Sequence, residues 1–216
     1  MAVDQSYTIL DPRPIAASAK YTFFLPTENE IAAVARGDLV KLTFEYTHQT
    51  DEWEVERMWV TVKEVEGETL YGVLENQPFE KTSMLKIGTQ ITFKRYNIVE
   101  ILWADGKPAP PRGEYREYWE RCLVDACVVD GSEPVEYIYR EDSNMQQDGD
   151  KYPDSGWRIR GRMGARVDTE MESRKPQYVA MGAVLNQDDS WISLIDAPIG
   201  SRFIRNFDDN TYILVK

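Results

Sequence analysis

The chain has 216 residues, of which 42% are hydrophobic and 29% charged, a composition typical of a folded protein. Its formal net charge of −12 disfavours nucleic acid and anionic membrane surfaces as direct partners, although many proteins are acidic for solubility alone. No apolar run approaches the ~20 residues of a membrane-spanning helix, and residues 1–6 lack the basic and apolar regions of a secretory signal, so we expect a cytoplasmic protein.

The first half of the chain predicts a small α+β domain over residues 23–105. Residues 1–22 are expected to be an irregular leader, because their prolines interrupt regular structure. A helix is predicted from Thr27, which can cap it together with Glu30, to Gly37. Alternating apolar and polar residues then predict strands, with a hairpin turn at 66–68, over residues 39–46, 57–65, 70–74 and 90–102.

His48 is the only histidine, and it lies in a polar stretch between two predicted strands. Nothing nearby resembles a nucleophile elbow, so we interpret His48 as a solvated loop residue rather than a general base. Cys122 and Cys127 are the only cysteines, and at this spacing in a strand they would point to opposite faces. We therefore expect no disulfide, no zinc site and two buried thiols.

A proline-rich segment separates the two halves. Residues 106–119 contain three prolines, which stiffen the chain and interrupt sheet ladders, so they predict a linker with a short helix over 114–121. The second domain is predicted over residues 120–216. Its strands are predicted over residues 123–129, 135–140, 157–160, 178–185, 191–195, 202–204 and 211–215. The fold class is therefore α+β, with two small, mostly antiparallel sheet domains in tandem, each with few short helices.

Residues 72–77 and 182–187 have similar sequences, and each stretch precedes an Ile-Gly pair, at 87–88 and 199–200. Two related sheet domains would explain this echo. Recurrent turn sequences would explain it as well, and the sequence leaves both explanations open.

Three aspartates in the second domain are candidates for a metal site. Asp188, Asp189 and Asp196 could bind a hard cation through oxygen ligands. They lack the alternating ligands and central glycine of a calcium loop, and Asn186 before them is a turn-forming residue, so we interpret the stretch as a hairpin loop. The chain has no phosphate-binding glycine loop and no dinucleotide fingerprint. The sequence thus predicts no cofactor, no metal and no catalytic residue.

Charge is unevenly distributed in the second domain. Residues 130–154 contain eight acids and two bases, a local net charge of −6, whereas residues 155–175 contain six bases and three acids, a net charge of +3. These charges could pair with each other across two strands, which contributes ~0–1 kcal/mol per exposed pair. Alternatively, the acids could form a patch for a cationic partner, with neighbouring aromatic residues as anchors. Strand alternation predicts that at least two of Tyr137, Tyr139 and Trp157 are buried instead.

The motifs of this domain resemble a known family. Residues 139–142 and 154–161, followed by 186–189 and 196–203, resemble in sequence and order a small bacterial domain that is grouped with the immunity proteins of polymorphic toxin systems, as the immunity-protein-33 type. The resemblance covers roughly residues 120–216. It implies a non-enzymatic immunity protein that binds and silences a cognate protein toxin.

The first half resembles a second small bacterial domain of unknown function, over roughly residues 28–103. The similar residues are 37–42, 56–60, 72–76 with Pro78, 87–88 and the strand at 91–93. The immunity-type domain alone does not include such a unit, so the pair could serve a role that the single domain lacks.

From the resemblance and the acidic stretch together, we predict a binding surface rather than an active site. A nuclease-like toxin with a basic cleft is the kind of partner that acidic side chains would cover. The predicted partner-binding residues are Glu136, Glu141, Asp142, Asp148, Asp150, Tyr152 and Asp154. Gly156 and Trp157 are assigned to the fold.

The sequence leaves two other functions open. One is a hydrolase-type enzyme with a carboxylate site between the two domains, which a deep cleft with carboxyl groups of raised pKa would support. The other is a structural or regulatory adaptor that binds no toxin. The oligomeric state is not predicted.

Overall fold

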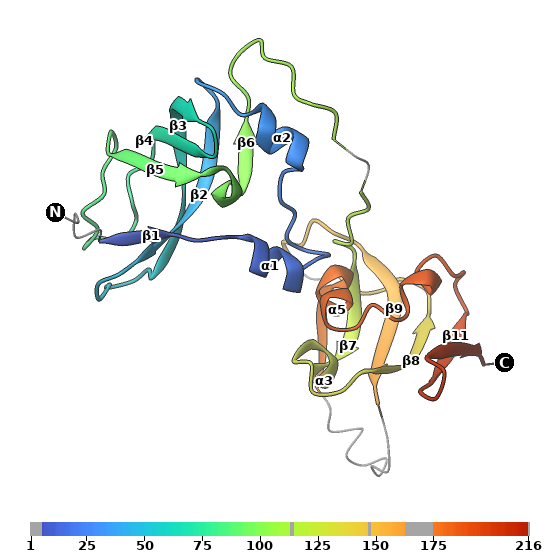
Figure 1. Cartoon of the computed structure of the whole chain (residues 1–216). Coiled ribbons are helices and arrows are strands. Elements are labelled where there is room, and N and C mark those ends of the chain that lie inside the picture. Colours follow the sequence, from blue (N-terminus) through green and yellow to red (C-terminus); the bar gives the residue numbers. More distant parts are fainter. Residues whose placement is uncertain (1–5, 113–114, 147, 163–174, 216) are drawn as a thin grey trace. The chain divides into compact units, whose positions relative to one another are not determined.

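The computed structural model describes residues 6–112, 115–146, 148–162 and 175–215 (Figure 1). The chain divides into two compact units. The N-terminal unit contains residues 1–18 and 23–114, and the C-terminal unit contains residues 19–22 and 115–216. In the part of the chain that the structure describes, each unit has one six-stranded, mostly antiparallel sheet and a few short helices. The predicted α+β class of two small sheet domains is confirmed.

The sheet of the N-terminal unit has the strand order β1-β2-β3-β4-β5, and β6 returns to pair with β2 as well (Figure 1). β1 pairs with residues 44–46 of β2 and β6 pairs with residues 39–41, so these two strands share one edge of β2. The elements of this unit are β1 (Tyr7–Ile9), α1 (Arg13–Ser18), α2 (Glu28–Ala33), β2 (Leu39–Tyr46), β3 (Val55–Glu66), β4 (Thr69–Leu74), β5 (Gln90–Lys94), η1 (Arg95–Asn97) and β6 (Glu100–Leu102).

Local sequence signals determine several of these elements. Thr27 and Glu30 form the predicted capping box at the start of α2. β2 spans the predicted residues, and its buried side chains, including Val40 and Leu42, form one face of the core. Gly67 has φ of 58°, which the β3–β4 hairpin turn requires and a glycine adopts without strain.

The leader and the last long strand of this unit differ from the prediction. Residues 1–22 are not irregular throughout, because β1 and α1 lie within them and the ring of Tyr7 packs 5.5 Å from that of Phe44. The predicted strand 90–102 is divided by η1, where the side chain of Asn97 binds two backbone groups, one of them in the segment after β1. Both differences depend on contacts between residues far apart in sequence. The alternation of apolar and polar residues along one strand cannot predict such contacts.

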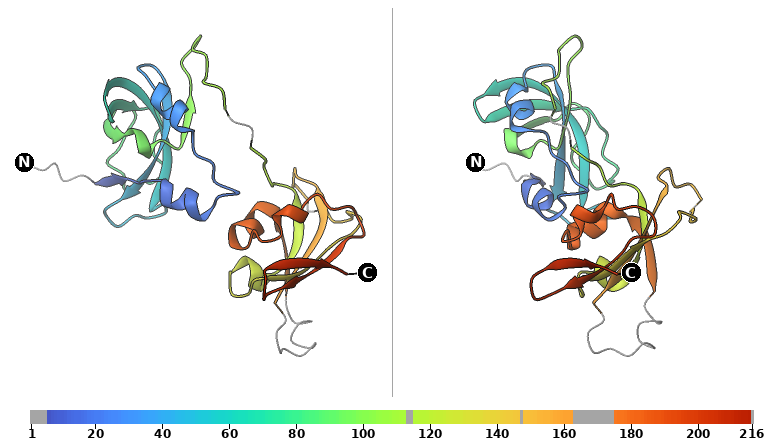
Figure 2. Two further views of the ribbon diagram at one scale, coloured as in Figure 1. Left: turned by 45° about the vertical axis from the view of Figure 1, so that its right-hand side comes forward. Right: turned by 90° about the vertical axis from the view of Figure 1, so that its right-hand side faces the viewer.

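The sheet of the C-terminal unit has the strand order β10-β7-β9-β8-β11-β12, and only the β7–β9 pair is parallel. The helices α3 and α5 pack on the same face of this sheet (Figure 2). The elements of this unit are β7 (Arg121–Asp125), α3 (Ala126–Val129), β8 (Val135–Arg140), β9 (Asp154–Gly161), β10 (Pro176–Ala180), α5 (Met181–Gln187), η2 (Ile192–Leu194), β11 (Arg202–Asn206) and β12 (Thr211–Leu214).

The core of this unit is organised around two tryptophans. Trp157 and Trp191 are fully buried, with their rings edge to face at 5.7 Å, and the Trp157 indole N–H donates to the Ile195 carbonyl at 3.0 Å. Cys122 is buried in this core, and its burial raises the pKa of the thiol to about 12. Cys127 is only half-buried, and neither cysteine takes part in a disulfide bond.

Four predicted elements of the C-terminal unit have a different structure. Residues 115–120 form no helix, and the predicted strand 123–129 begins earlier and ends in α3. The predicted strand 178–185 is β10 followed by α5, and residues 192–194 form the 3-10 turn η2. A short apolar run does not distinguish a buried strand from a buried helix. In α5 the buried residues recur at helical spacing, at Met181, Val184 and Leu185.

The repeated motif therefore does not mark equivalent elements. Residues 72–74 belong to β4, whereas residues 182–187 belong to α5. The two sheets also differ in strand order and in the presence of a parallel pair. Recurrent local sequence is the explanation that agrees with these structures.

The register of β8 shifts between Val135 and Tyr137, where it pairs with β9. Because of this shift, Val135 and Ile138 face the core, while Tyr137 and Tyr139 are half-buried. The prediction that at least two of the three aromatic residues are buried is wrong, since only Trp157 is buried. The two tyrosines lie side by side, with ring centroids 5.6 Å apart.

Candidate functional site

The acidic stretch that follows β8 is a loop that folds back onto the sheet, and a buried arginine of β9 holds it there. The Arg158 guanidinium donates to both carboxylate oxygens of Asp154, each at 2.9 Å, and its Nε donates to Glu141 at 2.6 Å. The side chains of Arg158 and Asp154 are each 2% exposed. An arginine buried in this way is stable only because its donors are paired in a bidentate geometry.

Asp154 also fixes the backbone of the loop. Its carboxylate accepts N–H groups from Asn144 at 3.3 Å and Met145 at 3.2 Å, and a third from Gly156 at 3.0 Å. The Tyr178 hydroxyl of β10 donates to the Met145 carbonyl at 3.3 Å, so a neighbouring strand holds the same residue. The first turn of the loop is therefore attached to the sheet through side chains of two strands.

The far end of the loop has a second anchor. Arg121, the first residue of β7, donates from Nε to Asp150, and Asp150 accepts the Tyr152 N–H at 3.1 Å. The ring of Tyr152 stacks on that of Trp119 with centroids 6.0 Å apart, and the Lys151 ammonium lies 4.7 Å from the Tyr152 centroid. We call residues 141–152 the acidic loop.

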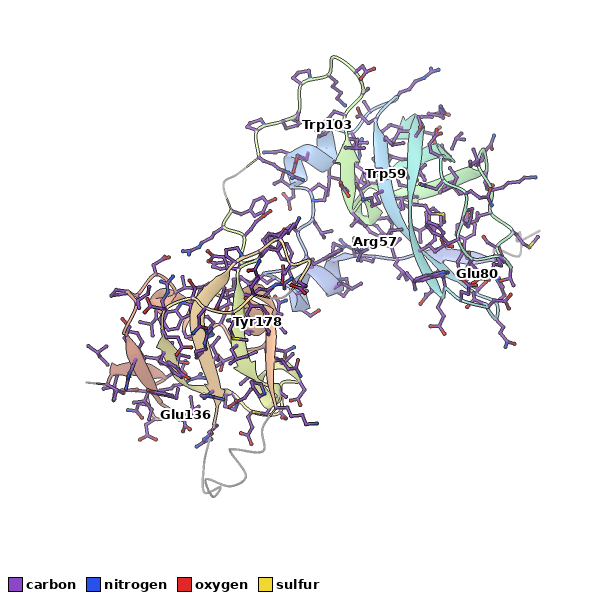
Figure 3. The ribbon with its side chains drawn as sticks, turned by 180° about the vertical axis from the view of Figure 1, so that it is seen from behind. Arg57, Trp59, Glu80, Trp103, Glu136 and Tyr178 are labelled. Carbon is purple, nitrogen blue, oxygen red and sulfur yellow. The ribbon has the colours of Figure 1, made fainter. Side chains whose placement is uncertain are left out.

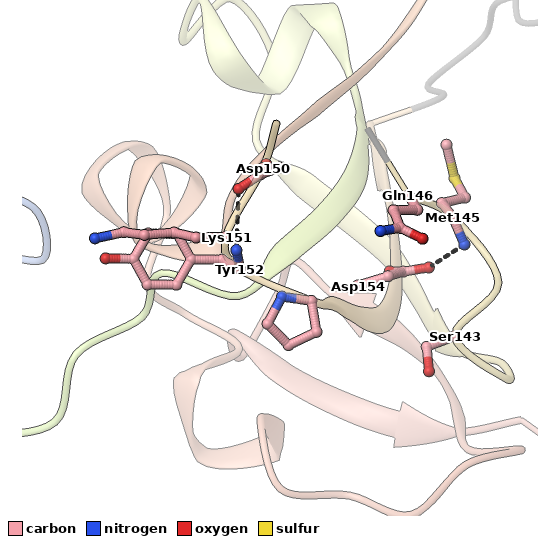
Figure 4. Close-up of a pocket in the computed structure, with 8 residues that line it drawn as sticks. Ser143, Met145, Gln146, Asp150, Lys151, Tyr152 and Asp154 are labelled. Atoms are coloured by element: carbon pink, nitrogen blue, oxygen red, sulfur yellow. Dashed lines mark hydrogen bonds between the residues drawn. The ribbon is translucent and has the colours of Figure 1, made fainter. Parts of the chain in front are cut away.

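The acidic loop encloses an open, mostly polar pocket of about 400 Å³ (Figure 4). Asp150 and Asp154 lie on its walls with Tyr152 between them in sequence. The full lining is Ser143, Met145, Gln146, Asp150, Lys151, Tyr152, Pro153 and Asp154. A space of this size can accept side chains of a partner or a small ligand.

The structure separates the seven predicted partner-binding residues into three groups. Asp154 is buried and ion-paired with Arg158, and its carboxylate positions the loop. Glu141 and Asp150 are paired with arginines, and Tyr152 is half-buried in its stack with Trp119. Asp142 and Asp148 are exposed, and Glu136 is half-exposed on β8 (Figure 3).

Internal pairing accounts for part of the charge contrast, since Arg158 pairs with Glu141 and Asp154 of the acidic stretch. Arg160 of β9 is 36% exposed and pairs instead with the fully buried Asp125, at 2.8 Å, outside that stretch. Most of the remaining basic stretch, residues 163–174, lies outside the described residues. The sequence does not single out Arg121 and Arg158 as the residues that hold the loop, because no local pattern distinguishes them from other strand arginines.

The ion pairs set a pH dependence for this unit. Burial alone would raise the pKa of Asp154, but hydrogen bonds from Arg158 and Gly156 outweigh it and hold the pKa below the usual value. The Arg121 hydrogen bond likewise lowers the pKa of Asp150. Carboxylates with a lowered pKa in the folded state stabilise the fold above the unfolded pKa of ~3.9, and the stabilisation is lost as the pH falls below it.

We therefore expect the C-terminal unit to lose stability between about pH 5 and pH 2. The measurement is native-state hydrogen exchange of the β9 amides at several pH values, with rates corrected for the intrinsic effect of pH. The free energy of opening should be constant from pH 7 to about pH 5 and then fall. Opening energies that stay constant down to pH 3 would contradict this account of the carboxylates.

The other candidate residues have structural partners. Asp188 accepts from Arg205 at 2.7 Å, Asp189 from the Tyr21 hydroxyl at 2.6 Å, and Asp196 pairs with Arg116. The three aspartates thus bind separate groups, and they follow α5 rather than forming a hairpin loop. Among the described residues, no three or more His, Cys, Asp or Glu side chains are grouped so that they could hold a metal ion.

His48 lies in the loop between β2 and β3, as predicted, but it is half-buried rather than fully solvated. One ring nitrogen lies 3.3 Å from the Ser6 carbonyl and the other 3.1 Å from the Thr82 hydroxyl, which itself donates to Glu80. The ring also packs edge-on against Tyr46 at 5.5 Å. The contacts of His48 connect three segments of the N-terminal unit and give it a structural role.

Each half of the chain matches the model of a known family. Residues 122–215 match the family model of the immunity protein Imm33 domain, and residues 16–111 match that of an uncharacterized protein conserved in bacteria, DUF2314. The two matches confirm both resemblances. No curated protein and no solved structure matches the chain.

The Imm33 match covers almost all of the C-terminal unit, including the acidic loop and Arg158, whereas Arg121 lies just before the matched residues. An Imm33 domain indicates an immunity protein in general, and hence a toxin as the kind of partner. None of the helices in the described ranges has the length and apolarity needed to cross a membrane.

Proposed function

We propose that this chain is a non-enzymatic, cytoplasmic immunity protein that neutralises a cognate bacterial toxin by binding it, and that the acidic loop of the Imm33 unit contacts the toxin. The observation that carries the proposal is the anchoring of this loop. Arg158 and Arg121 hold its two ends, while Asp142 and Asp148 stay exposed between them.

A loop ordered before binding loses little conformational entropy in the complex. Its exposed carboxylates can face a basic surface, such as the cleft of a nuclease-like toxin, and accelerate association. The aromatic pair of Tyr152 and Trp119 and the adjoining pocket offer contacts for apolar or long side chains of the toxin. Glu136 lies on β8, the strand that leads into the loop, and is included as a flanking contact.

The chemistry of the carboxyl groups favours binding over hydrolysis. A general acid needs a raised pKa. Asp150, Asp154 and Glu80 have lowered pKa values instead, because hydrogen-bond donors surround them.

The test is the double charge reversal Asp142→Lys/Asp148→Lys in the full chain. We expect an affinity at least ~10-fold weaker for an inactive form of the toxin encoded immediately upstream, with most of the change in the association rate. In co-expression with the active toxin, this variant should no longer restore growth.

The matched control is Asp105→Lys/Asp208→Lys, which makes the same change in net charge at exposed turns in each unit. The control should bind within about twofold of the wild type. If the loop variant and the control bind equally well, the acidic loop is not the interface.

A further inference from the structure

The N-terminal unit carries large apolar side chains on two loops at one end of its sheet. The β2–β3 loop presents Trp53, which is 51% exposed. The β4–β5 loop presents Phe79, Met84 and Ile87, which are 79%, 80% and 58% exposed. We call these four residues the two-loop surface.

A buried carboxylate connects the two loops. Glu80 of the β4–β5 loop is 2% exposed, and it accepts the backbone N–H groups of three successive residues of the other loop, among them Glu52 and Trp53, each at 2.9 Å (Figure 3). It also accepts the N–H and hydroxyl groups of Thr82, at 2.9 and 2.6 Å. These donors hold the pKa of Glu80 well below its usual range.

A second buried carboxylate, on β3, binds the backbone of the β4–β5 loop. Glu56 of β3 accepts the N–H groups of Phe79 at 2.7 Å and Glu80 at 3.1 Å, together with the hydroxyl of Tyr46. Burial and this hydrogen bond raise the pKa of Tyr46 to about 12. Glu80 therefore holds the backbone of the β2–β3 loop, and Glu56 holds the backbone of the β4–β5 loop. Both glutamates have a structural role.

This anchoring bears on how the apolar side chains are presented. The backbone N–H groups of Trp53 and Phe79 are bound by carboxylates, so the backbone that carries these two exposed rings is held in place. Large apolar side chains presented by a rigid backbone are typical of protein-binding hot spots, because little ordering is needed when they are covered.

The charge around the two-loop surface restricts what can cover it. Residues 47–54 and 75–88 contain four exposed acids and two exposed lysines, a net charge of −2, within a chain of net charge −12; the fifth acid, Glu80, is buried. This negative charge disfavours a second copy of the chain, nucleic acid and an anionic membrane. The complementary occupant is a protein that presents an apolar pocket with Lys or Arg at its rim.

We propose that the two-loop surface is a second contact site for the same toxin, in addition to the acidic loop of the Imm33 unit. This inference rests on the proposed function, because that function names the toxin as the partner. Two contact sites joined by one linker bind more tightly than either alone, because the second contact forms within the first complex. The DUF2314 unit would then be part of the immunity mechanism.

The test is the double variant Phe79→Ser/Met84→Ser in the full chain, titrated with the inactive toxin. Both side chains are exposed, so the variant should keep the melting temperature of the wild type within a few degrees. We expect the dissociation constant to rise at least ~10-fold. The matched control Ile15→Ser/Leu102→Ser also removes two exposed apolar side chains, and Leu102 pairs with Leu39 at the opposite end of β2.

The outcomes separate the two proposals. Weaker binding by the two-loop variant, with the control unchanged, supports the second contact site, whether or not the acidic-loop variant is also weakened. Wild-type affinity in the two-loop variant overturns the second site alone. No binding by the wild-type chain overturns this inference together with the proposed function.

Discussion

Asp154→Ala is expected to lower the unfolding free energy of the C-terminal unit by about 3–5 kcal/mol. The substitution leaves the Arg158 guanidinium, which is 2% exposed, with Glu141 as its one remaining carboxylate. It also removes the acceptor of three backbone N–H groups of the loop and of β9. A buried charge without its partner and several unsatisfied donors are each strongly destabilising.

The measurement is urea denaturation of the full chain, with the C-terminal transition followed through the amides of β9. Asp142→Ala is the matched control, because Asp142 is exposed, and it should change the free energy by no more than ~0.5 kcal/mol. The double variant Asp154→Leu/Arg158→Met should be more stable than Asp154→Ala, because it removes both buried charges. A loss below ~1 kcal/mol for Asp154→Ala would show that water reaches Arg158.

Gly156→Ala is expected to cost about 3 kcal/mol or more. A Cβ at this position would lie 2.1 Å from the backbone carbonyl oxygen of Glu141, whose own N–H donates to the Gly156 carbonyl at 2.9 Å. Because the contact is with backbone, the acidic loop must move away from β9 to relieve it. The φ of +80° adds the strain of a left-handed conformation that alanine rarely adopts.

Gly149 provides the matched control, since its φ is +81° and an added Cβ would meet nothing within 4 Å. Gly149→Ala should cost only the conformational strain, about 1 kcal/mol. The difference between the two variants in unfolding free energy, measured with denaturant, gives the cost of the steric contact between the loop and β9. Equal losses in the two variants would mean that the loop does not pack against Gly156 as the structure shows.

Local signals in the sequence were sufficient for much of the fold. The capping box at Thr27, the alternation of β2 and the turn at Gly67 each depend on a few neighbouring residues, and all three are present in the structure. β1 was missed because its stability comes from pairing with β2 and from the packing of Tyr7 on Phe44. α5 was taken for a strand because its apolar run is too short to show a period.

The sequence predicts where the acidic loop lies in the chain, but it does not predict the ion pairs that fold the loop. Counting acids located the loop correctly between β8 and β9, but the count could not show which carboxylates are paired. That depends on Arg158 and Arg121, which reach the loop only after the sheet has formed. The exposed negative charge of the loop is consequently smaller than its composition suggests, and Asp142 and Asp148 carry most of it.

The acidic loop of the C-terminal unit is the surface that we propose binds the toxin. The most direct test of this proposal is hydrogen exchange of the full chain with and without the inactive toxin. The account predicts slower exchange of the amides in residues 141–152 in the complex, with β11 and β12 unchanged. A stable complex in which the amides of residues 141–152 exchange as fast as in the free chain would contradict it.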